Sequence, residues 1–137
     1  MSRLIKFRVW DKLAEQFYYA DSPARQHFNL SLDGRFCNLQ NGAGGDEVVV
    51  QQFTGLSDRK AREVYEGDIL FDPFHSGWWE SGWWEIGWNA FELGFEFKLI
   101  KYTGDTLTGR HIACPEVSRE DFEIVGNIFE NPELCAK

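Results

Sequence analysis

The chain has 137 residues and a mass of 15.9 kDa, which fits one domain or two small subdomains that share a core. Hydrophobic residues make up 43% of it and aromatic residues 16%, which excludes intrinsic disorder, and no apolar run approaches the roughly 20 residues that cross a bilayer. With 22 acidic and 14 basic residues the formal charge is -8, and this charge disfavours general nucleic-acid binding.

The beginning of the chain and its cysteines predict a cytoplasmic location. Apolar and charged side chains alternate within the first six residues, so we expect no secretory signal. The three cysteines, Cys37, Cys114 and Cys135, are odd in number and widely spaced, which favours free thiols in a reducing compartment.

The first predicted strand lies close to the start of the sequence. Its period-two pattern puts Ile5, Phe7 and Val9 on one face and Lys6 and Arg8 on the other, as in a half-buried strand. The short aromatic segment 17–19, which follows a turn predicted at 11–12, is the expected hairpin partner of this strand.

A second hairpin is predicted between Phe28 and Leu39, around the Asp-Gly pair at 33–34. A two-residue type I′ loop there places Phe28 opposite Leu39 and Leu30 opposite Cys37, so that the apolar residues share a face. In this register Cys37 is a core residue rather than a reactive thiol.

The glycine-rich loop 41–46 marks the expected internal boundary. We interpret 1–137 as a single domain in which 1–45 forms N-terminal strands and a hairpin, and 46–137 forms a small barrel portion. The β-branched segment 48–53 opens the second part as a strand.

Further strands are expected downstream. A turn is predicted at 54–56, and a tight turn at Gly67 and Asp68 leads into a buried strand. Segments 83–88 and 95–100 alternate as two more strands around a turn. Short strands with frequent glycine turns indicate a mainly β chain, folded as a curved antiparallel sheet or small barrel.

Helical signals are confined to the end of the chain. Ser118 and Asp121 have capping-box spacing, which predicts one helical turn before a last strand at 122–129. Asn131 and Pro132, followed by a carboxylate, favour a very short terminal helix.

Four stretches together carry a family resemblance: IKFRVWD at 5–11, VQQFTGLSD at 50–58, VYEGDIL at 64–70 and FEIVGNIFENPEL at 122–134. This pattern resembles the YopX family of small phage and prophage proteins. The resemblance implies a mainly β fold with an SH3-like barrel portion. It implies no activity, so no catalytic residue can be assigned from it.

The chain departs from that pattern in two places. Lys60 and Ala61 stand where the family has an Asn-Gly turn, and alanine is strained at positive φ, so we expect that turn to be rebuilt as one helical turn over 59–63. The segment 77–88 is an apparent insertion that holds five of the six tryptophans.

The tryptophan-rich segment is the candidate binding site. Adjacent tryptophans in a strand point to opposite faces, so some of them should be exposed, and exposed tryptophan often anchors protein interfaces. We expect Trp78, Trp79 and Trp83 to form a partner-binding surface with an acidic rim. It would suit a partner protein, a basic peptide, a proline-rich segment or a second copy of the chain.

Simple packing is the alternative for this segment. Trp84, Ile86 and Trp88 fall on one face of the predicted strand and are expected to line the core. In that case Trp78 and Trp79 lie in a glycine-flanked loop and carry no function.

Catalytic and metal-binding patterns are weak. Asp68 or Asp72 with Glu96 and Lys98 imitates the acidic and Glu-x-Lys arrangement of metal-dependent nucleases, but opposite charges on a solvated strand face explain it better. His111 and Cys114 have zinc-like spacing without a second pair, so we expect no metal and no cofactor.

The sequence therefore favours a non-enzymatic interaction module that binds a host or phage protein. Two alternatives stay open, a nuclease-like metal-dependent enzyme and an acidic mimic of nucleic acid that occupies a host protein.

Overall fold

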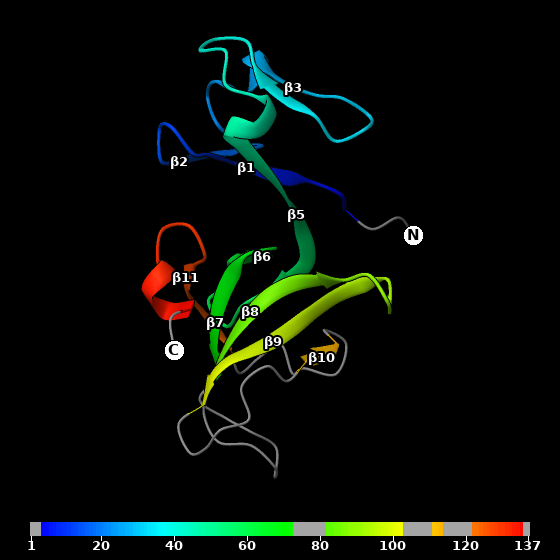
Figure 1. The fold of residues 1–137 in the computed structure, drawn as a ribbon, viewed down its shortest axis with the longest axis vertical. Helices are drawn as coiled ribbons and strands as arrows, with labels where there is room; N and C mark the ends of the chain where they lie inside the picture. Colours follow the sequence, from blue (N-terminus) through cyan, green and yellow to red (C-terminus); the bar gives the residue numbers. More distant parts are fainter. Residues whose placement is uncertain (1–3, 73–81, 103–110, 114–121, 136–137) are drawn as a thin grey trace. The chain divides into compact units, whose positions relative to one another are not determined.

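The computed structural model describes residues 4–72, 82–102, 111–113 and 122–135, and its regular structure is almost entirely β (Figure 1). The strands are β1 (Phe7–Asp11), β2 (Gln16–Tyr19), β3 (Phe28–Leu30), β4 (Phe36–Asn38), β5 (Val48–Ser57), β6 (Glu63–Tyr65), β7 (Asp68–Asp72), β8 (Gly82–Asn89), β9 (Gly94–Tyr102), β10 (His111–Ala113) and β11 (Glu123–Asn127). Helical structure among the described residues is limited to the 3₁₀ turns η1 (Arg25–His27), η2 (Gly45–Glu47) and η4 (Pro132–Cys135). The mainly β prediction is confirmed.

The chain divides into two compact units, residues 1–53 and 54–137. Strand β5 runs through the boundary, so its first six residues belong to one unit and its last four to the other. No helix in the described ranges is long and apolar enough to span a membrane.

The first unit holds three strands of the four-stranded sheet β2-β1-β5-β6, and a hairpin packs on them. Strands β2 and β5 pair with β1 on either side, and Val9 lies opposite both Tyr18 and Val50. One face of this sheet meets the β3–β4 hairpin in a cluster of apolar side chains. Its members are Val9, Tyr18, Phe36 and Ala43, with Phe28, Val48 and Val50 around them.

Strand β1 is buried on both faces, whereas the sequence predicted a half-buried strand. Arg8 lies opposite the apolar face, as its alternation requires, yet only 4% of it is exposed. Its Nε donates to Gln51 Oε1 at 2.8 Å, and its guanidinium lies 4.3 Å from the centre of the Phe17 ring. These contacts compensate for the hydration that the guanidinium loses on burial. Arg8 can therefore be buried in the sheet beside Phe17.

The β3–β4 hairpin exists, but its predicted register is wrong by one residue. Phe28 lies opposite Asn38 and Leu30 opposite Phe36. Ser31 N–H donates to the Arg35 carbonyl, so the loop has three residues and ends at Gly34, whose φ is 87°. A three-residue loop with a left-handed glycine replaces the expected type I′ turn.

This shift changes which side chains are buried, because a slip of one residue moves every side chain to the other face. Phe36 and Asn38 are buried, while Leu39 is exposed. Cys37 is half-buried with a free thiol, so its predicted place in the core is wrong.

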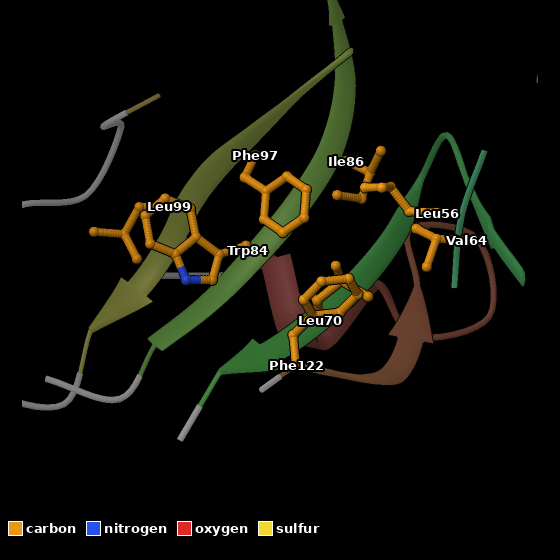
Figure 2. Close-up of a cluster of buried hydrophobic side chains, with 8 residues drawn as sticks. All are labelled: Leu56, Val64, Leu70, Trp84, Ile86, Phe97, Leu99 and Phe122. Atoms are coloured by element: carbon orange, nitrogen blue, oxygen red, sulfur yellow. The ribbon is translucent and has the colours of Figure 1, made fainter. Parts of the chain in front are cut away.

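The second unit is built on a five-stranded antiparallel sheet in the order β10-β9-β8-β7-β11, curled into half a barrel (Figure 1). Figure 2 shows the side chains that fill its concave side and point toward one another. The cluster consists of Leu56, Val64, Leu70, Trp84, Ile86, Phe97, Leu99 and Phe122. The alternation predicted for segments 83–88 and 95–100 is confirmed for Trp84, Ile86, Phe97 and Leu99.

The predicted tight turn at Gly67 and Asp68 is confirmed. Gly67 has a φ of 82°, and its N–H donates to the Ile86 carbonyl at 2.8 Å. The buried Asp68 carboxylate accepts the N–H of Tyr65 at 2.8 Å. The turn predicted at 54–56 is wrong, because β5 continues to Ser57 through Gly55 at a φ of 89°.

The turn that links β5 to β6 keeps a left-handed residue, contrary to the predicted helical turn over 59–63. Ala61 has a φ of 63°, and its N–H donates to the Asp58 carbonyl at 2.9 Å. The buried Asp58 carboxylate accepts the N–H groups of Lys60 and Arg62 at 3.0 and 2.9 Å. Because the carboxylate fixes the loop, alanine is held where glycine or asparagine is preferred.

The end of the chain is organised by two asparagines. Asn127 Oδ1 accepts the N–H groups of Phe129 and Glu130, and Asn131 Oδ1 accepts the N–H of Asn127. The predicted short terminal helix is confirmed as η4, a 3₁₀ turn. The helical turn predicted from Ser118 and Asp121 lies outside the described residues.

Candidate functional site

Of the three tryptophans predicted to bind a partner, the structure describes Trp83, while Trp78 and Trp79 lie outside the described residues. Trp83 is half-buried on β8, opposite Phe71 of β7. The two rings pack with their centres 4.7 Å apart. Trp83 therefore contributes to the packing of its own sheet, and its role in a partner surface stays a prediction.

Among the described residues of the second unit, the largest exposed apolar side chains lie at the end of the β8–β9 hairpin. Trp88 was predicted to line the core, but 51% of it is exposed. In the turn beyond it, Phe91 is 99% exposed and Leu93 is 76% exposed. We call Trp88, Phe91, Leu93 and the half-buried Phe95 the hairpin tip. Such a group of exposed apolar side chains on a soluble surface is typical of an interaction site.

The base of the hairpin tip is anchored on the core. Trp88 and Phe95 are opposite each other in the β8–β9 register, and their rings meet edge to face with centres 5.3 Å apart. Phe95 also packs against the buried cluster of the second unit. The tip therefore extends the core side of the sheet past the last buried residues, which explains why Trp88 has the alternation of a core residue without being covered.

The turn at the tip has a defined conformation. Asn89 Oδ1 accepts the N–H of Phe91 at 2.9 Å and that of Glu92 at 3.1 Å. Asn89 Nδ2 donates to Glu96 Oε2 at 2.9 Å, and Leu93 adopts a φ of 55°. An asparagine that binds the next main-chain amides is a common means of fixing a turn. The exposed rings are thus presented by an ordered backbone.

Sequence reasoning missed this site although a signal was present. The segment 89–94 was recognised as a turn, and turn residues are usually polar or small. Phe91 and Leu93 do not fit that rule, because both are large, apolar residues in a predicted turn.

The residues of the nuclease alternative are not brought together. Glu85 and Lys98 are opposite each other, and Ile69 lies opposite Glu85, so Lys98 shares a sheet face with Ile69. Asp68 and Asp72 alternate with Ile69 and point to the other face. Asp68 is also committed to the main chain of Tyr65. Glu96 shares the face of Lys98, but the two aspartates and Lys98 therefore lack a common site.

No metal centre is found in the part of the chain that the structure describes, where no three His, Cys, Asp or Glu side chains gather. Cys114, the partner that spacing suggested for His111, lies outside the described residues. Cys135 is a free, half-buried thiol, and burial raises its pKa, with the negative charges of Glu85 and Glu133 adding to the effect. A raised pKa disfavours the reactive thiolate.

The basic segment 59–62 has a structural role. Arg62 binds the Asp58 carboxylate through Nε at 3.0 Å and donates from Nη2 to the Ile124 carbonyl at 2.7 Å. Lys60 Nζ pairs with Glu123 Oε1. Burial alone raises the pKa of Asp58, but hydrogen bonds from the main chains of Ile124 and Arg62 and from the Arg62 side chain outweigh it and hold that pKa below its usual value.

Together, the strands and turns define a small, mainly β protein whose curled antiparallel sheet carries exposed apolar side chains at the tip of the β8–β9 hairpin. The model of one family, described as YopX protein, matches residues 6–136, so the chain belongs to the YopX family. No curated protein matches the chain.

Several solved chains match the structure, and two of them illustrate the shared fold. One is the crystal structure of protein EF1440 from Enterococcus faecalis, at 24% identity and a TM-score of 0.58, covering 98% of this chain and 99% of that one. The other is the X-ray crystal structure of protein yopX from Bacillus subtilis, at 17% identity and a TM-score of 0.58, covering 96% of each chain. At these identities the likeness concerns the fold alone.

Proposed function

We propose that the protein is a non-enzymatic interaction module of phage or prophage type, and that its hairpin tip binds a host or phage protein. The proposal rests on one observation. Phe91, Leu93 and Trp88 are 99%, 76% and 51% exposed on a turn whose main chain is fixed by Asn89. Exposing large apolar side chains costs roughly 25 cal/mol per Å², and a partner surface recovers that free energy.

The hydrogen-bonded turn that carries the exposed side chains favours a role of the tip in binding a partner. A side chain on a disordered loop loses conformational entropy on binding, whereas the tip already holds its turn through hydrogen bonds of 2.9 and 3.1 Å. Aromatic anchors supply much of the binding energy of protein interfaces. Trp88 and Phe91 are therefore the residues on which we expect binding to depend most, with Trp78, Trp79 and Trp83 as a second proposed contact surface.

The test is a comparison of three tagged full-length proteins passed through a lysate of the bacterial host. Phe91→Ser removes the most exposed side chain of the hairpin tip, and Leu32→Ser removes an equally exposed apolar residue from the turn of another hairpin. A protein retained by the wild type and by Leu32→Ser but lost from Phe91→Ser supports the proposal. Equal retention by all three variants rules out the tip as the binding site.

The enzymatic alternative has its own assay. A nuclease should degrade DNA or RNA in the presence of Mg²⁺ or Mn²⁺ and should lose that activity in Lys98→Ala. Because the sheet places Lys98 on the face opposite Asp68 and Asp72, we expect no such activity from the wild type. Metal-dependent cleavage that Lys98→Ala abolishes would overturn the non-enzymatic proposal.

A further inference from the structure

The shape of the hairpin tip restricts the partner that can cover it. Phe91 and Leu93 project from a turn between two paired strands, and each is more than three-quarters exposed. A projecting turn cannot surround a ligand, so the concave side of the contact has to come from the partner. An anchor side chain that fills an apolar pocket is the usual arrangement at the centre of such interfaces.

The charge around the tip restricts the partner further. Between Trp88 and Lys98 the charged residues are Glu92 and Glu96, and both are acidic. Glu92 lies between Phe91 and Leu93 in sequence and is exposed, whereas Glu96 is bound to Asn89 Nδ2. The whole chain, these two residues included, has a formal charge of -8. An acidic group among apolar anchors favours a partner with Lys or Arg at the rim of its pocket.

A second copy of the chain fits this surface poorly. Symmetric contact would bring Glu92 against Glu92 and one charge of -8 against another. The three most exposed tip residues present on the order of 400–500 Å² of apolar surface, whereas each side of a standard interface buries about 800 Å². A basic pocket on a different protein avoids the charge repulsion and can surround the projecting side chains.

We propose that the hairpin tip inserts Phe91 and Leu93 into an apolar pocket of a basic partner protein, where Glu92 pairs with a Lys or Arg at the pocket rim. This inference rests on the proposed function and adds the chemistry of the partner. Packing against the pocket supplies most of the affinity, and Glu92 supplies orientation and a faster association.

The experiment separates the two contributions with charge variants of the full chain. The protein retained in the lysate comparison is identified, purified and titrated at 50 and 300 mM KCl against the wild type, Phe91→Ser, Glu92→Lys and Asp21→Lys. The last of these makes the same change in net charge at an exposed residue of another unit. We expect Phe91→Ser to weaken binding at least tenfold at both salt concentrations, because it removes the anchor.

We expect Glu92→Lys to weaken binding about three- to tenfold at 50 mM KCl and less at 300 mM, because salt screens a rim charge. Asp21→Lys should change the affinity for the retained protein less than twofold. If Phe91→Ser abolishes binding while Glu92→Lys and Asp21→Lys behave alike, the proposed function stands and the basic rim is wrong.

Other outcomes overturn the inference in different ways. Dimerisation of the wild type that Phe91→Ser abolishes, measured by sedimentation equilibrium, makes a second copy the occupant. Phe91-dependent binding to phosphatidylcholine vesicles makes the tip a membrane contact. If no variant differs from wild type in retained protein, dimerisation or vesicle binding, both this inference and the proposed function of the tip fail.

Discussion

At the scale of single residues, Ala61 shows how a side chain can be held in a conformation that it disfavours. Its φ of 63° lies in the left-handed region, where a Cβ atom costs roughly 1 kcal/mol relative to glycine. Asp58 supplies the compensation, since its buried carboxylate binds the main chain on both sides of Ala61.

The first prediction is that Ala61→Gly is more favourable than Ala90→Gly by about 1 kcal/mol, because it removes the strain at positive φ while both changes add similar entropy to the unfolded chain. The free energy of unfolding from a urea titration is the measurement. Ala90→Gly is the matched control, because Ala90 lies in an exposed turn without a positive φ, and glycine there should give no gain. Equal effects of the two changes would contradict this account of the turn.

Asp58 also predicts a pH dependence of stability. Its pKa is lowered in the folded state, so its contribution is fully present above the ordinary value near 4 and is lost as the pH falls through the folded pKa. Asp58→Asn should cost about 2 kcal/mol at pH 7, because an amide cannot accept the same set of N–H donors. The difference from wild type should shrink at pH 3, because below its ordinary pKa near 4 the carboxyl binds a proton in the unfolded chain, which favours unfolding of the wild type.

Urea titrations of both proteins at pH 7 and pH 3 measure this difference. The exposed Asp21→Asn is the control and should show no gap at either pH. If the gap between wild type and Asp58→Asn is the same at pH 3 as at pH 7, ionisation of Asp58 does not stabilise the fold.

At the scale of elements, the edge of the five-stranded sheet shows why Asp58 matters beyond its own turn. Its Oδ2 accepts the N–H of Ile124, Arg62 donates to the Ile124 carbonyl, and the N–H of Arg59 donates to the Phe122 carbonyl. The loop thus occupies main-chain groups of β11 that a free edge would leave open. Covered edges protect a sheet from pairing with other chains.

The connection from β11 to η4 yields the third prediction. A Cβ atom on Gly126 would lie 2.5 Å from Asn131 Oδ1 and 2.7 Å from its Cγ, so Gly126→Ala has to displace Asn131. Asn131 Oδ1 also accepts the N–H of Asn127, and that hydrogen bond would be lost. We expect a loss of about 1–3 kcal/mol in the free energy of unfolding.

Gly87 of β8 provides the control for this change. A Cβ atom there meets nothing within 4 Å, so Gly87→Ala should have no destabilising effect and could gain up to about 1 kcal/mol from the lower entropy of the unfolded chain. Urea titrations of both alanine variants test the pair. Equal stability of Gly126→Ala and wild type would show that Asn131 can move at little cost.

The elements also show what the sequence could and could not predict. Strands β8 and β9 were predicted correctly because their alternation is long and regular. The register of the β3–β4 hairpin was not, because an Asp-Gly pair suits both a two-residue turn and a three-residue loop that ends in a left-handed glycine. Local pattern cannot choose between them when the choice depends on which residues a distant sheet covers.

The candidate site illustrates the same limit. Alternation identified the face of Trp88 correctly, but exposure depends on how far other elements cover that face, and 51% of Trp88 is exposed while Ile86, two residues before it, is buried. The left-handed conformation of Ala61 was missed for a related reason. Its compensation comes from Asp58, which is itself fixed by Ile124, 66 residues away in sequence.

At the scale of the whole molecule, fold and proposed function depend on different residues of the same hairpin. Trp84 and Ile86 are 4% and 1% exposed in the core, while Trp88, on the same face of β8, is 51% exposed. The two structural neighbours share the fold at identities of 24% and 17%, which supports the buried architecture and leaves the exposed tip to be tested directly.

The fourth prediction uses this separation. Trp84→Ala should lower the free energy of unfolding by about 3–5 kcal/mol, because it leaves a cavity among Leu70, Phe97 and Leu99. Phe91→Ser should change it by less than about 0.5 kcal/mol, because the ring is 99% exposed and the turn is held by Asn89. Urea titrations monitored by far-UV circular dichroism measure the free energy of unfolding of both variants.

The two results together decide whether the binding comparison can be interpreted. If Phe91→Ser unfolds as the wild type does, any loss of association in that variant reports the surface and not a damaged fold. If instead it loses more than about 1 kcal/mol, Phe91 packs against other parts of the protein in solution, and the tip is a structural contact rather than a binding site. Trp84→Ala shows how large the loss of stability is when a core side chain is removed. The Trp84 ring belongs to the buried cluster against which Phe95 of the tip packs.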